Sequence, residues 1–257
     1  VLALVTGAPP QPGRVTCSMG SSSMVYCPLA PGQQAQDPQG RIYIYPLLPY
    51  PLLGGVSSTS GAALQWAYNT LFVDGESFAG AVSEAIQVPA GADDLIFLPF
   101  LSGERSPFWS DRLRGSFYGL TLNHHRGHMM RAVMEGVAFS LRYLLDIFAE
   151  CGVPVSEIAL AGGGSEIQGW PEMIAAICKR PVVLYSGQET VTRGLYAYAC
   201  QVMEKDVPFG QALMRTFQPA EHIEADRQYD PVYDRLFRQY CQLAEFADGV
   251  LSRNQNQ

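Results

Sequence analysis

An alternation of two residue patterns between positions 94 and 204 restricts the fold of this chain more than any other feature. Apolar runs of strand length, such as DLIFLPF (94–100), IALA (158–161) and PVVLY (181–185), alternate there with segments of helical spacing. Neighbouring parallel strands need a crossover connection, which is usually a helix, and regular alternation is typical of that arrangement. The alternation therefore predicts a largely parallel sheet with helices packed against it.

The part of the chain before residue 94 has a different pattern. RVTCSMGSSSMVYCP (14–28) predicts a β-hairpin, because two short runs of strand character flank a turn of small residues. GRIYIYPLL (40–48) predicts a third strand by alternation of isoleucine with tyrosine. Helices are predicted at 60–72 and 77–88, and a long polar loop is predicted at 101–117. A strand hairpin therefore precedes the alternating region.

Two further helical patterns complete the prediction. A broad apolar face recurs from about His128 to Ala149, and the last helix is expected to have Asp230 at its N-cap and Pro231 at its first position. No internal repeat of fixed period is present. A single domain over residues 1–257 is therefore expected.

Composition limits the classes of partner. The 257 residues are 47% apolar and 16% charged, which suits a soluble globular protein, and a net charge of −7 argues against nucleic acid and anionic membranes. No apolar run has the length of a membrane span and the first residues lack a secretory pattern, so a cytoplasmic location is expected. The six cysteines form no C-x-x-C pair and are expected to be reduced thiols, without disulfides or zinc.

Two turns of small residues are candidates for binding phosphate or nucleotide. LAGGGSEIQG (160–169) places three glycines between a predicted strand and a helix, where backbone can approach a ligand and helix N–H groups are free. SMGSSS (18–23) offers hydroxyl and N–H groups that could wrap a terminal phosphate. Taken alone, each stretch is better explained as an ordinary turn without a ligand. Neither has the spacing of a Walker A loop or of a dinucleotide-binding fingerprint.

A third stretch, GSFYGLTLNHHRGHMMRAVMEG (115–136), resembles the C-terminal signature of the FGGY family of carbohydrate kinases. LPFLSGERSPFW, QPGRVTCSMGSSS and the segments FQPAEH and YDPVYDRLFRQYCQL resemble other parts of the same family, so the resemblance covers nearly the whole chain. The positions that fit the signature are Gly115 or Ser116, Phe117, Gly119, Leu120, His128, Met129, Ala132, Val133, Met134 and Glu135.

The resemblance implies an α/β fold, namely an actin-like ATPase domain of the ribonuclease H-like type with a mixed sheet flanked by helices. Such a domain is the C-terminal half of a two-domain kinase that closes over ATP, Mg²⁺ and a sugar. The ATP-binding residues implied are Gly20, Ser21 and Ser22 at the terminal phosphates, Gly61 and Gln65 near phosphate and ribose, Gly163 and Gly164 at the adenosine, and Gln168 beside them.

The chain departs from the family pattern at two places. Ser21 stands where the family usually has threonine, which keeps the hydroxyl group. In TVTRGLYAYA, four larger or more polar residues replace the family's Ala-Leu-Gly-Ala-Ala run, which affects the expected packing beside the nucleotide. These residues are Thr192, Arg193, Leu195 and Tyr196.

The family's general base, an aspartate, aligns just before Val1, so no catalytic residue is assigned within this chain. We therefore expect a C-terminal fragment whose own N-terminal domain supplies the base and most sugar contacts, and which is inactive alone. Exposure of the face that would meet that domain could let such chains associate as a homodimer.

Three histidines and several other residues admit more than one interpretation. His124 and His128 have the spacing of two metal ligands on one helical face, with His125 between them, but no third ligand accompanies them and no metal site is predicted. The remaining candidates are Glu104 and Arg105, which either pair or border an active site, Asp93 and Asp94, interpreted as caps of the next strand, and Trp66, Trp109 and Trp170, interpreted as packing residues.

Three functions are compatible with these observations. The first is a kinase that uses ATP to phosphorylate a sugar, polyol or sugar acid, with a slight preference for gluconate-like over xylulose-like substrates from RGSFYGLTL and HMMRAVMEGV. The second is a nucleotide-binding or interaction domain that kept the fold without the reaction. A dehydrogenase is disfavoured because the dinucleotide fingerprint is missing. The residues of this chain do not identify the sugar.

Overall fold

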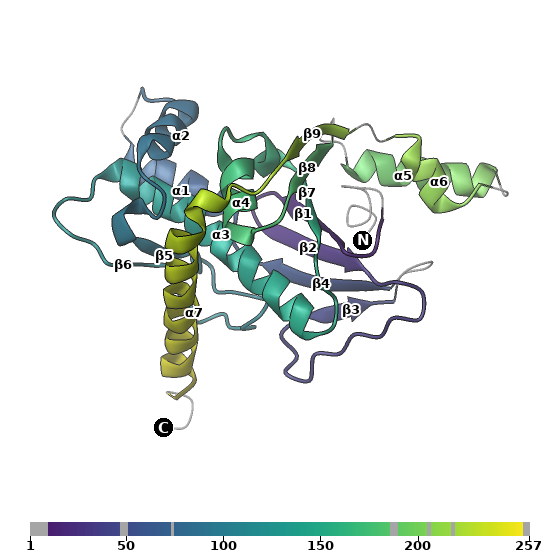
Figure 1. Cartoon of the computed structure of the whole chain (residues 1–257), viewed down its shortest axis with the longest axis horizontal. Helices are drawn as coiled ribbons and strands as arrows, with labels where there is room; N and C mark the ends of the chain where they lie inside the picture. The colour runs from purple at the N-terminus through teal and green to yellow at the C-terminus, as the bar shows by residue number, and fades with distance from the viewer. Residues whose placement is uncertain are drawn as a thin grey trace.

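A seven-stranded sheet forms the centre of the molecule (Figure 1). The computed structural model describes residues 10–46, 51–72, 75–185, 190–204, 207–216 and 219–253. The strand order is β3-β4-β2-β1-β7-β8-β9, so β1 has three strands on each side. The strands are β1 (Arg14–Met19), β2 (Ser23–Pro28), β3 (Tyr43–Tyr45), β4 (Leu52–Ser57), β7 (Glu157–Ala161), β8 (Val182–Tyr185) and β9 (Pro219–Ile223).

This sheet is mixed rather than largely parallel. β1 pairs parallel with β7, where Cys17 lies opposite Leu160, and β7 pairs parallel with β8. The other neighbours in the described sheet are antiparallel. The mixed sheet implied by the family resemblance is confirmed, whereas the largely parallel sheet predicted from the alternation is wrong. The first strand of that alternation, β5 (Ile96–Leu98), pairs antiparallel with β6 (Ser116–Tyr118) in a separate two-stranded sheet.

The longest helix, α3 (Arg126–Glu150), contains the helix predicted from His128 to Ala149. At Gly136 its backbone comes so close to β5 that an added Cβ would lie 2.3 Å from the carbonyl oxygen of Phe97. The other helices are α1 (Gly61–Leu71), α2 (Phe78–Gln87), α4 (Trp170–Cys178), α5 (Thr190–Met203), α6 (Phe209–Met214) and α7 (Asp230–Arg253), with 3₁₀ helices η2 (Ala92–Asp94), η3 (Gly163–Glu166) and η4 (Arg227–Tyr229).

Most of these helices cover the central sheet or α3, but α5 and α6 lie apart from the main body (Figure 1). They pack on each other through Ala197, Cys200, Ala212 and Leu213, which form a small apolar cluster of their own. Leu195 and Tyr196, two of the residues that depart from the family pattern, lie half exposed on α5. None of the described residues of α5 is among those that line the cavity described below.

Besides the short 3₁₀ helices, three strands and one α-helix were not predicted from the sequence, namely β4, β6, β9 and α6. In β4 the cause is a pair of glycines, which by pattern favour a turn over a strand. Packing favours glycine at both positions, because a Cβ on Gly54 would lie 2.5 Å from the ring of Tyr26, and one on Gly55 would make a tight contact of 3.1 Å with the Leu144 side chain. Packing against neighbouring elements therefore overrides the local pattern.

The predicted cap of the last helix also needs correction. Asp230 is the first residue of α7 and has helical backbone angles, so it is not the N-cap residue. The helix η4 leads directly into α7 and has its own cap, Asp226, whose Oδ1 accepts the N–H of Gln228 (3.1 Å). All six cysteines are unpaired thiols. Within the described ranges, no helix has both the length and the apolar character that crossing a membrane requires.

Candidate functional site

A cavity of about 680 Å³ lies where three segments distant in sequence meet. These segments are the turn between β1 and β2, the first half of α1, and the glycine turn that follows β7. A cavity of this volume is typical of a small-molecule site. Its walls are formed by Met19, Gly20, Ser21, Gly61, Ala62, Gln65, Trp66, Asn69, Phe78, Gly163, Gly164 and Ile167.

The N-terminus of α1 binds the turn between β1 and β2. The N–H groups of Ser60 and Ala62 donate to the carbonyl oxygen of Ser21 (2.8 and 3.1 Å), and the N–H of Gly61 donates to that of Gly20 (2.9 Å). A Cβ on Gly61 would lie 2.7 Å from the Gly20 oxygen, so a glycine is needed there. The turn and the start of α1 are consequently fixed to each other.

The three glycines after β7 have different structural roles. Gly162 has a φ of +81°, and an added Cβ would lie 2.7 Å from the carbonyl oxygen of Met19. A Cβ on Gly164 would meet the Met19 side chain at 2.7 Å, whereas one on Gly163 would meet nothing within 4 Å. Gly162 and Gly164 are therefore required by packing against the end of β1, and Gly163 is left open at the cavity.

The helix predicted after the glycine turn, over residues 169–178, is confirmed as α4 (Trp170–Cys178). The glycines do not lead straight into its N-terminus, because the short helix η3 (Gly163–Glu166) lies between them. Instead they lead into η3, in which the N–H and hydroxyl of Ser165 donate to the Gly162 oxygen (3.0 and 2.7 Å). α4 begins only at Trp170, so its N–H groups do not end at the glycine turn.

Side chains from α1 form the polar and aromatic part of the wall. Gln65 donates its amide to Asn69 Oδ1 (2.9 Å). Trp66 stacks on Phe97 at 5.9 Å between ring centroids and keeps 37% of its surface exposed. The packing role predicted for Trp66 is thus correct but incomplete, because its ring also borders the cavity.

The other two tryptophans lie outside the cavity wall. Trp170 is fully buried and donates its indole N–H to the Met134 oxygen of α3 (3.1 Å), so its predicted packing role is confirmed. Trp109 is half exposed, with its indole N–H donating to the Arg41 oxygen (3.1 Å), and it is a surface rather than a core residue.

Six of the eight residues that the resemblance assigns to ATP line the cavity, namely Gly20, Ser21, Gly61, Gln65, Gly163 and Gly164. Ser22 is not part of the wall, and its carbonyl oxygen accepts the N–H of Gly20 (3.0 Å) within the turn. Gln168 is not part of it either, and the preceding Ile167 contacts the cavity instead. The binding roles of all eight residues stay predictions.

Sequence reasoning missed several residues of the wall. Asn69 lies one helical turn after Gln65, a spacing that could have indicated it. Phe78 belongs to another helix, and no local pattern marks it. Met19, Ala62 and Ile167 resemble ordinary core residues in the sequence.

Glu104 lies behind this site, with 2% of its surface exposed. Its Oε1 accepts the N–H groups of Ser58 (2.6 Å) and Arg105 (2.7 Å). The Arg105 guanidinium does not reach the carboxylate and donates to the Ser57 oxygen (2.8 Å). Burial raises the pKa of Glu104 to about 7, although the two N–H donors oppose that shift. Glu104 therefore fixes the chain between β4 and α1 rather than bordering the cavity.

The histidines lie at the start of α3, away from the cavity. His125 caps the helix, since its Nδ1 accepts the N–H of Gly127 (3.1 Å). The Nε2 atoms of His124 and His128 contact the backbone oxygen and the carboxylate of Asp93, each at 3.1 Å. Among the described residues, no group of three or more His, Cys, Asp or Glu side chains is arranged to hold a metal ion.

Asp93 and Asp94 were interpreted as caps of the following strand, and their side chains instead contact helices. Both residues have positive φ angles, 51° and 70°, within η2. Asp93 contacts His128 on α3, and Asp94 pairs with Arg235 on α7 (2.5 Å). These aspartates therefore connect η2 to the helices.

The sequence of this chain is similar to a protein-family model and to several known proteins. A model of the FGGY family of carbohydrate kinases, C-terminal domain, matches residues 15–202. The gluconokinase of Bacillus subtilis (strain 168) is 27% identical over an alignment of 263 positions, and the alignment covers 93% of this chain and 50% of that protein. The xylulose kinase of the same strain is 30% identical over an alignment of 186 positions, which covers 71% of this chain and 36% of that protein.

A solved structure agrees with these matches. The crystal structure of gluconate kinase from Lactobacillus acidophilus superposes with a TM-score of 0.87 at 27% identity, covering 96% of this chain and 50% of that one. This chain therefore spans about half the length of the gluconokinase relatives that it matches.

Proposed function

Because this chain belongs to the FGGY family of carbohydrate kinases, we propose that it is the ATP-binding domain of a kinase that phosphorylates a sugar, polyol or sugar acid. Its fold is the actin-like ATPase fold of that family. One observation in the chain itself carries the proposal. The cavity at the β1–β2 turn, α1 and the glycine turn brings together six of the residues expected to contact ATP.

We assign the terminal phosphates to the β1–β2 turn. Gly20 and Ser21 are exposed there, and the Ser21 hydroxyl can donate to a phosphate oxygen. The adjacent N-terminus of α1 adds a partial positive charge. Mg²⁺ would neutralise charge that develops on the phosphoryl oxygens. The described wall contains no carboxylate, which fits an ion held by phosphate oxygens and water.

We assign the adenosine to the opposite end of the cavity. Phe78 and Ile167 provide apolar surface there, and Gly163 leaves room for close approach of a ligand to the backbone. Gln65 and Asn69 supply amide groups that can hydrogen-bond to a ribose or base. An apolar wall with a few polar groups is the usual composition of such a site.

The sugar and the general base are assigned to a separate N-terminal domain. The matched gluconokinases are about twice as long as this chain, which supports such a partner. This chain alone should therefore bind nucleotide without turnover, because the reaction needs a base within reach of the sugar hydroxyl. We also propose a cytoplasmic location, and the homodimer stays a prediction.

Gluconate is the substrate that we would test first. The gluconokinase match extends over 93% of this chain and the xylulose kinase match over 71%, at similar identity. The test is ADP formation from Mg·ATP by the full-length gene product, with gluconate, D-xylulose, L-ribulose and glycerol offered separately. Stimulation by one of them supports the kinase and identifies its substrate. A folded protein that binds Mg·ADP but responds to none of these or further polyols would support the non-catalytic alternative.

The nucleotide site can be tested separately with Gly163→Ala. An added methyl group at this position would meet no atom of the protein within 4 Å, so the melting temperature should stay unchanged. It would nevertheless occupy space in the cavity, and the affinity for Mg·ADP measured by calorimetry should fall about tenfold. Equal affinity of the variant and the parent would contradict the assignment of this glycine turn to the nucleotide.

A further inference from the structure

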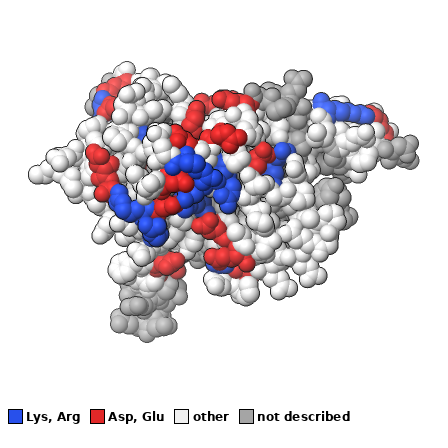
Figure 2. Space-filling view, viewed as in Figure 1, with Lys and Arg blue, Asp and Glu red and all other residues white. Residues whose placement is uncertain are grey.

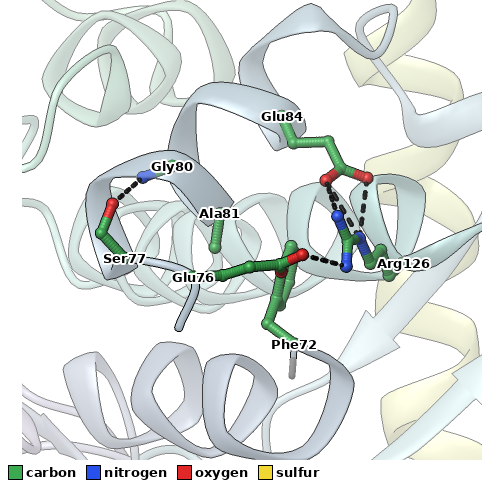
Figure 3. A pocket seen from close by; sticks show the side chains of 7 residues that line it. All are labelled: Phe72, Glu76, Ser77, Gly80, Ala81, Glu84 and Arg126. Carbon is green, nitrogen blue, oxygen red and sulfur yellow. Dashed lines mark hydrogen bonds and ion pairs between the residues drawn. The ribbon is translucent and has the colours of Figure 1, made fainter. Parts of the chain in front are cut away.

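The first turn of α2 separates the proposed nucleotide cavity from a second pocket. Phe78 borders the nucleotide cavity, whereas Ser77 and Gly80 border a pocket of about 270 Å³ on the other side. This second pocket is shown in Figure 3 and is lined by Phe72, Glu76, Ser77, Gly80, Ala81, Glu84 and Arg126. The first turn of α2 therefore lies between two cavities, although the Phe78 ring itself also packs on other side chains.

Arg126, at the start of α3, holds this wall in place (Figure 3). Its guanidinium donates to both oxygens of Glu84 on α2 (3.0 and 3.2 Å from Nε) and to Glu76 Oε1 (2.8 Å). The guanidinium carbon also lies 4.7 Å from the ring centroid of Phe72, at the end of α1. One side chain thus connects α1, α2, α3 and the segment that enters α2.

Two contacts carry this restraint to the nucleotide cavity. The Tyr68 hydroxyl donates to the backbone oxygen of Glu76 (2.5 Å), and the Tyr68 ring meets Phe78 edge-on at 5.5 Å. Tyr68 lies on α1 beside Asn69, which together with Phe78 borders the cavity. The ion pairs of Arg126 and the position of Phe78 are therefore parts of one connected arrangement.

We propose that Arg126 is a positioning residue that sets the place of Phe78 and so the affinity of the site for nucleotide. This inference rests on the proposed function, since it assigns the adenosine to the cavity bordered by Phe78. The other end of α2 has its own anchor, because the Arg131 guanidinium donates to the backbone oxygens of Ala85 and Ile86 (3.5 and 3.3 Å). Loss of Arg126 should therefore release the first turn of α2 and leave the rest of the helix in place.

The test compares Arg126→Ala with Arg142→Ala in the full-length gene product. Arg142 is a matched control, because it also lies on α3, pairs with a carboxylate (Asp234, 2.8 Å) and stacks on an aromatic ring (Phe237, 4.2 Å). Arg126→Ala should raise KM for Mg·ATP about tenfold with kcat within about twofold, whereas Arg142→Ala should leave both unchanged. The dissociation constant of Mg·ADP, followed by the fluorescence of Trp66 at the cavity, should rise by the same factor.

Two further variants keep the inference testable if Arg126→Ala does not fold. Arg126→Lys retains the charge but cannot bridge two carboxylates with a planar fork, and Glu76→Gln removes one ion pair only. Each should raise KM by about threefold, less than the alanine variant. Unchanged KM in folded Arg126→Ala, or in both milder variants, would show that Arg126 is purely structural and overturn the inference. Failure of the unsubstituted protein to bind Mg·ADP would instead refute the proposed function itself.

Discussion

Glu104 shows how a single buried residue shapes the candidate site from behind. Its carboxylate accepts the N–H of Ser58, two residues before Ser60, which is the N-cap residue of α1 and donates its own N–H to the Ser21 oxygen. Its second oxygen, Oε2, has no hydrogen-bond partner within the described structure. A charged carboxylate in such a position is costly, which is why burial raises its pKa to about 7.

Replacement of this carboxyl by an amide should change how stability depends on pH. Glu104 has a higher pKa in the folded chain (about 7) than its ordinary value of 4.5, so the folded state holds the proton more tightly. The contribution of this raised pKa to the free energy of unfolding is fully present below about pH 4.5. It is lost as the pH rises through about 7, by roughly 3 kcal/mol in total. Glu104→Gln cannot titrate, so its stability relative to the parent should improve by up to that amount between pH 5 and 7.5.

Urea unfolding of both proteins at these two pH values measures this difference. The glutamine variant keeps an oxygen that can accept the N–H groups of Ser58 and Arg105, so it should fold. If the free energies of unfolding of the parent and the variant changed equally with pH, the raised pKa of Glu104 would be contradicted.

Among the elements, α3 depends most on one close approach. Gly136 lies in the buried middle of this helix, next to the carbonyl oxygen of Phe97 on β5. Glycine is normally unfavourable in a helix, by about 1 kcal/mol relative to alanine. Here the missing Cβ allows the helix and the strand to touch, so the local disadvantage is offset by packing.

Gly136→Ala should therefore destabilise the fold although alanine favours helices. The new Cβ would lie 2.3 Å from the Phe97 oxygen and force α3 away from β5, at a cost of about 1–3 kcal/mol in urea unfolding. Gly249→Ala in α7 is the control, because its Cβ would meet nothing within 4 Å. That substitution should stabilise by about 0.5–1 kcal/mol. If both substitutions changed the free energy of unfolding in the same direction, the packing argument would be contradicted.

Elements with a strong local pattern could be predicted, and those defined by distant contacts could not. The helix of 128–149 and the hairpin of 14–28 follow from apolar spacing within one segment. The strand β4 was not predicted because its glycines, Gly54 and Gly55, pack against Tyr26 and Leu144, which are far away in the sequence. The same reason explains the missed wall residue Phe78. Gly20, Gly163 and Gly164 lie in turns whose local pattern made them candidates, whereas Gly61 was found only through the family resemblance.

At the scale of the whole molecule, a buried network joins three parts of the chain. Glu135 on α3 accepts the N–H of Gly91 (2.9 Å), the guanidinium of Arg131 (2.8 Å) and the hydroxyl of Tyr233 on α7 (3.1 Å). The Tyr233 hydroxyl also accepts from Arg131 (3.2 Å). Burial raises the pKa of Glu135, and its charged and polar partners oppose this shift without cancelling it. The network therefore connects α7 to α3 and to the loop before η2.

Removal of one hydroxyl from this network should weaken the entire fold. Tyr233→Phe leaves the buried Arg131 without one acceptor and Glu135 without one donor, which should cost about 1–3 kcal/mol. Tyr229→Phe, at a partly exposed position nearby, should change the unfolding free energy by less than about 0.5 kcal/mol. Urea unfolding checks both values, and equal effects would argue against a network role for Tyr233.

The hydrogen bonds between the β1–β2 turn and the start of α1 join residues that are distant in sequence. Residues 20–21 and 60–62 are separated by about forty residues, and they meet where β4 pairs with β2, with Ser57 opposite Ser23. A chain in which the helices have formed but β4 has not paired with β2 lacks the cavity, although it contains every residue that lines the cavity. A ligand of this cavity would consequently bind the folded chain and not the unfolded one, and by mass action its presence would raise the free energy of unfolding.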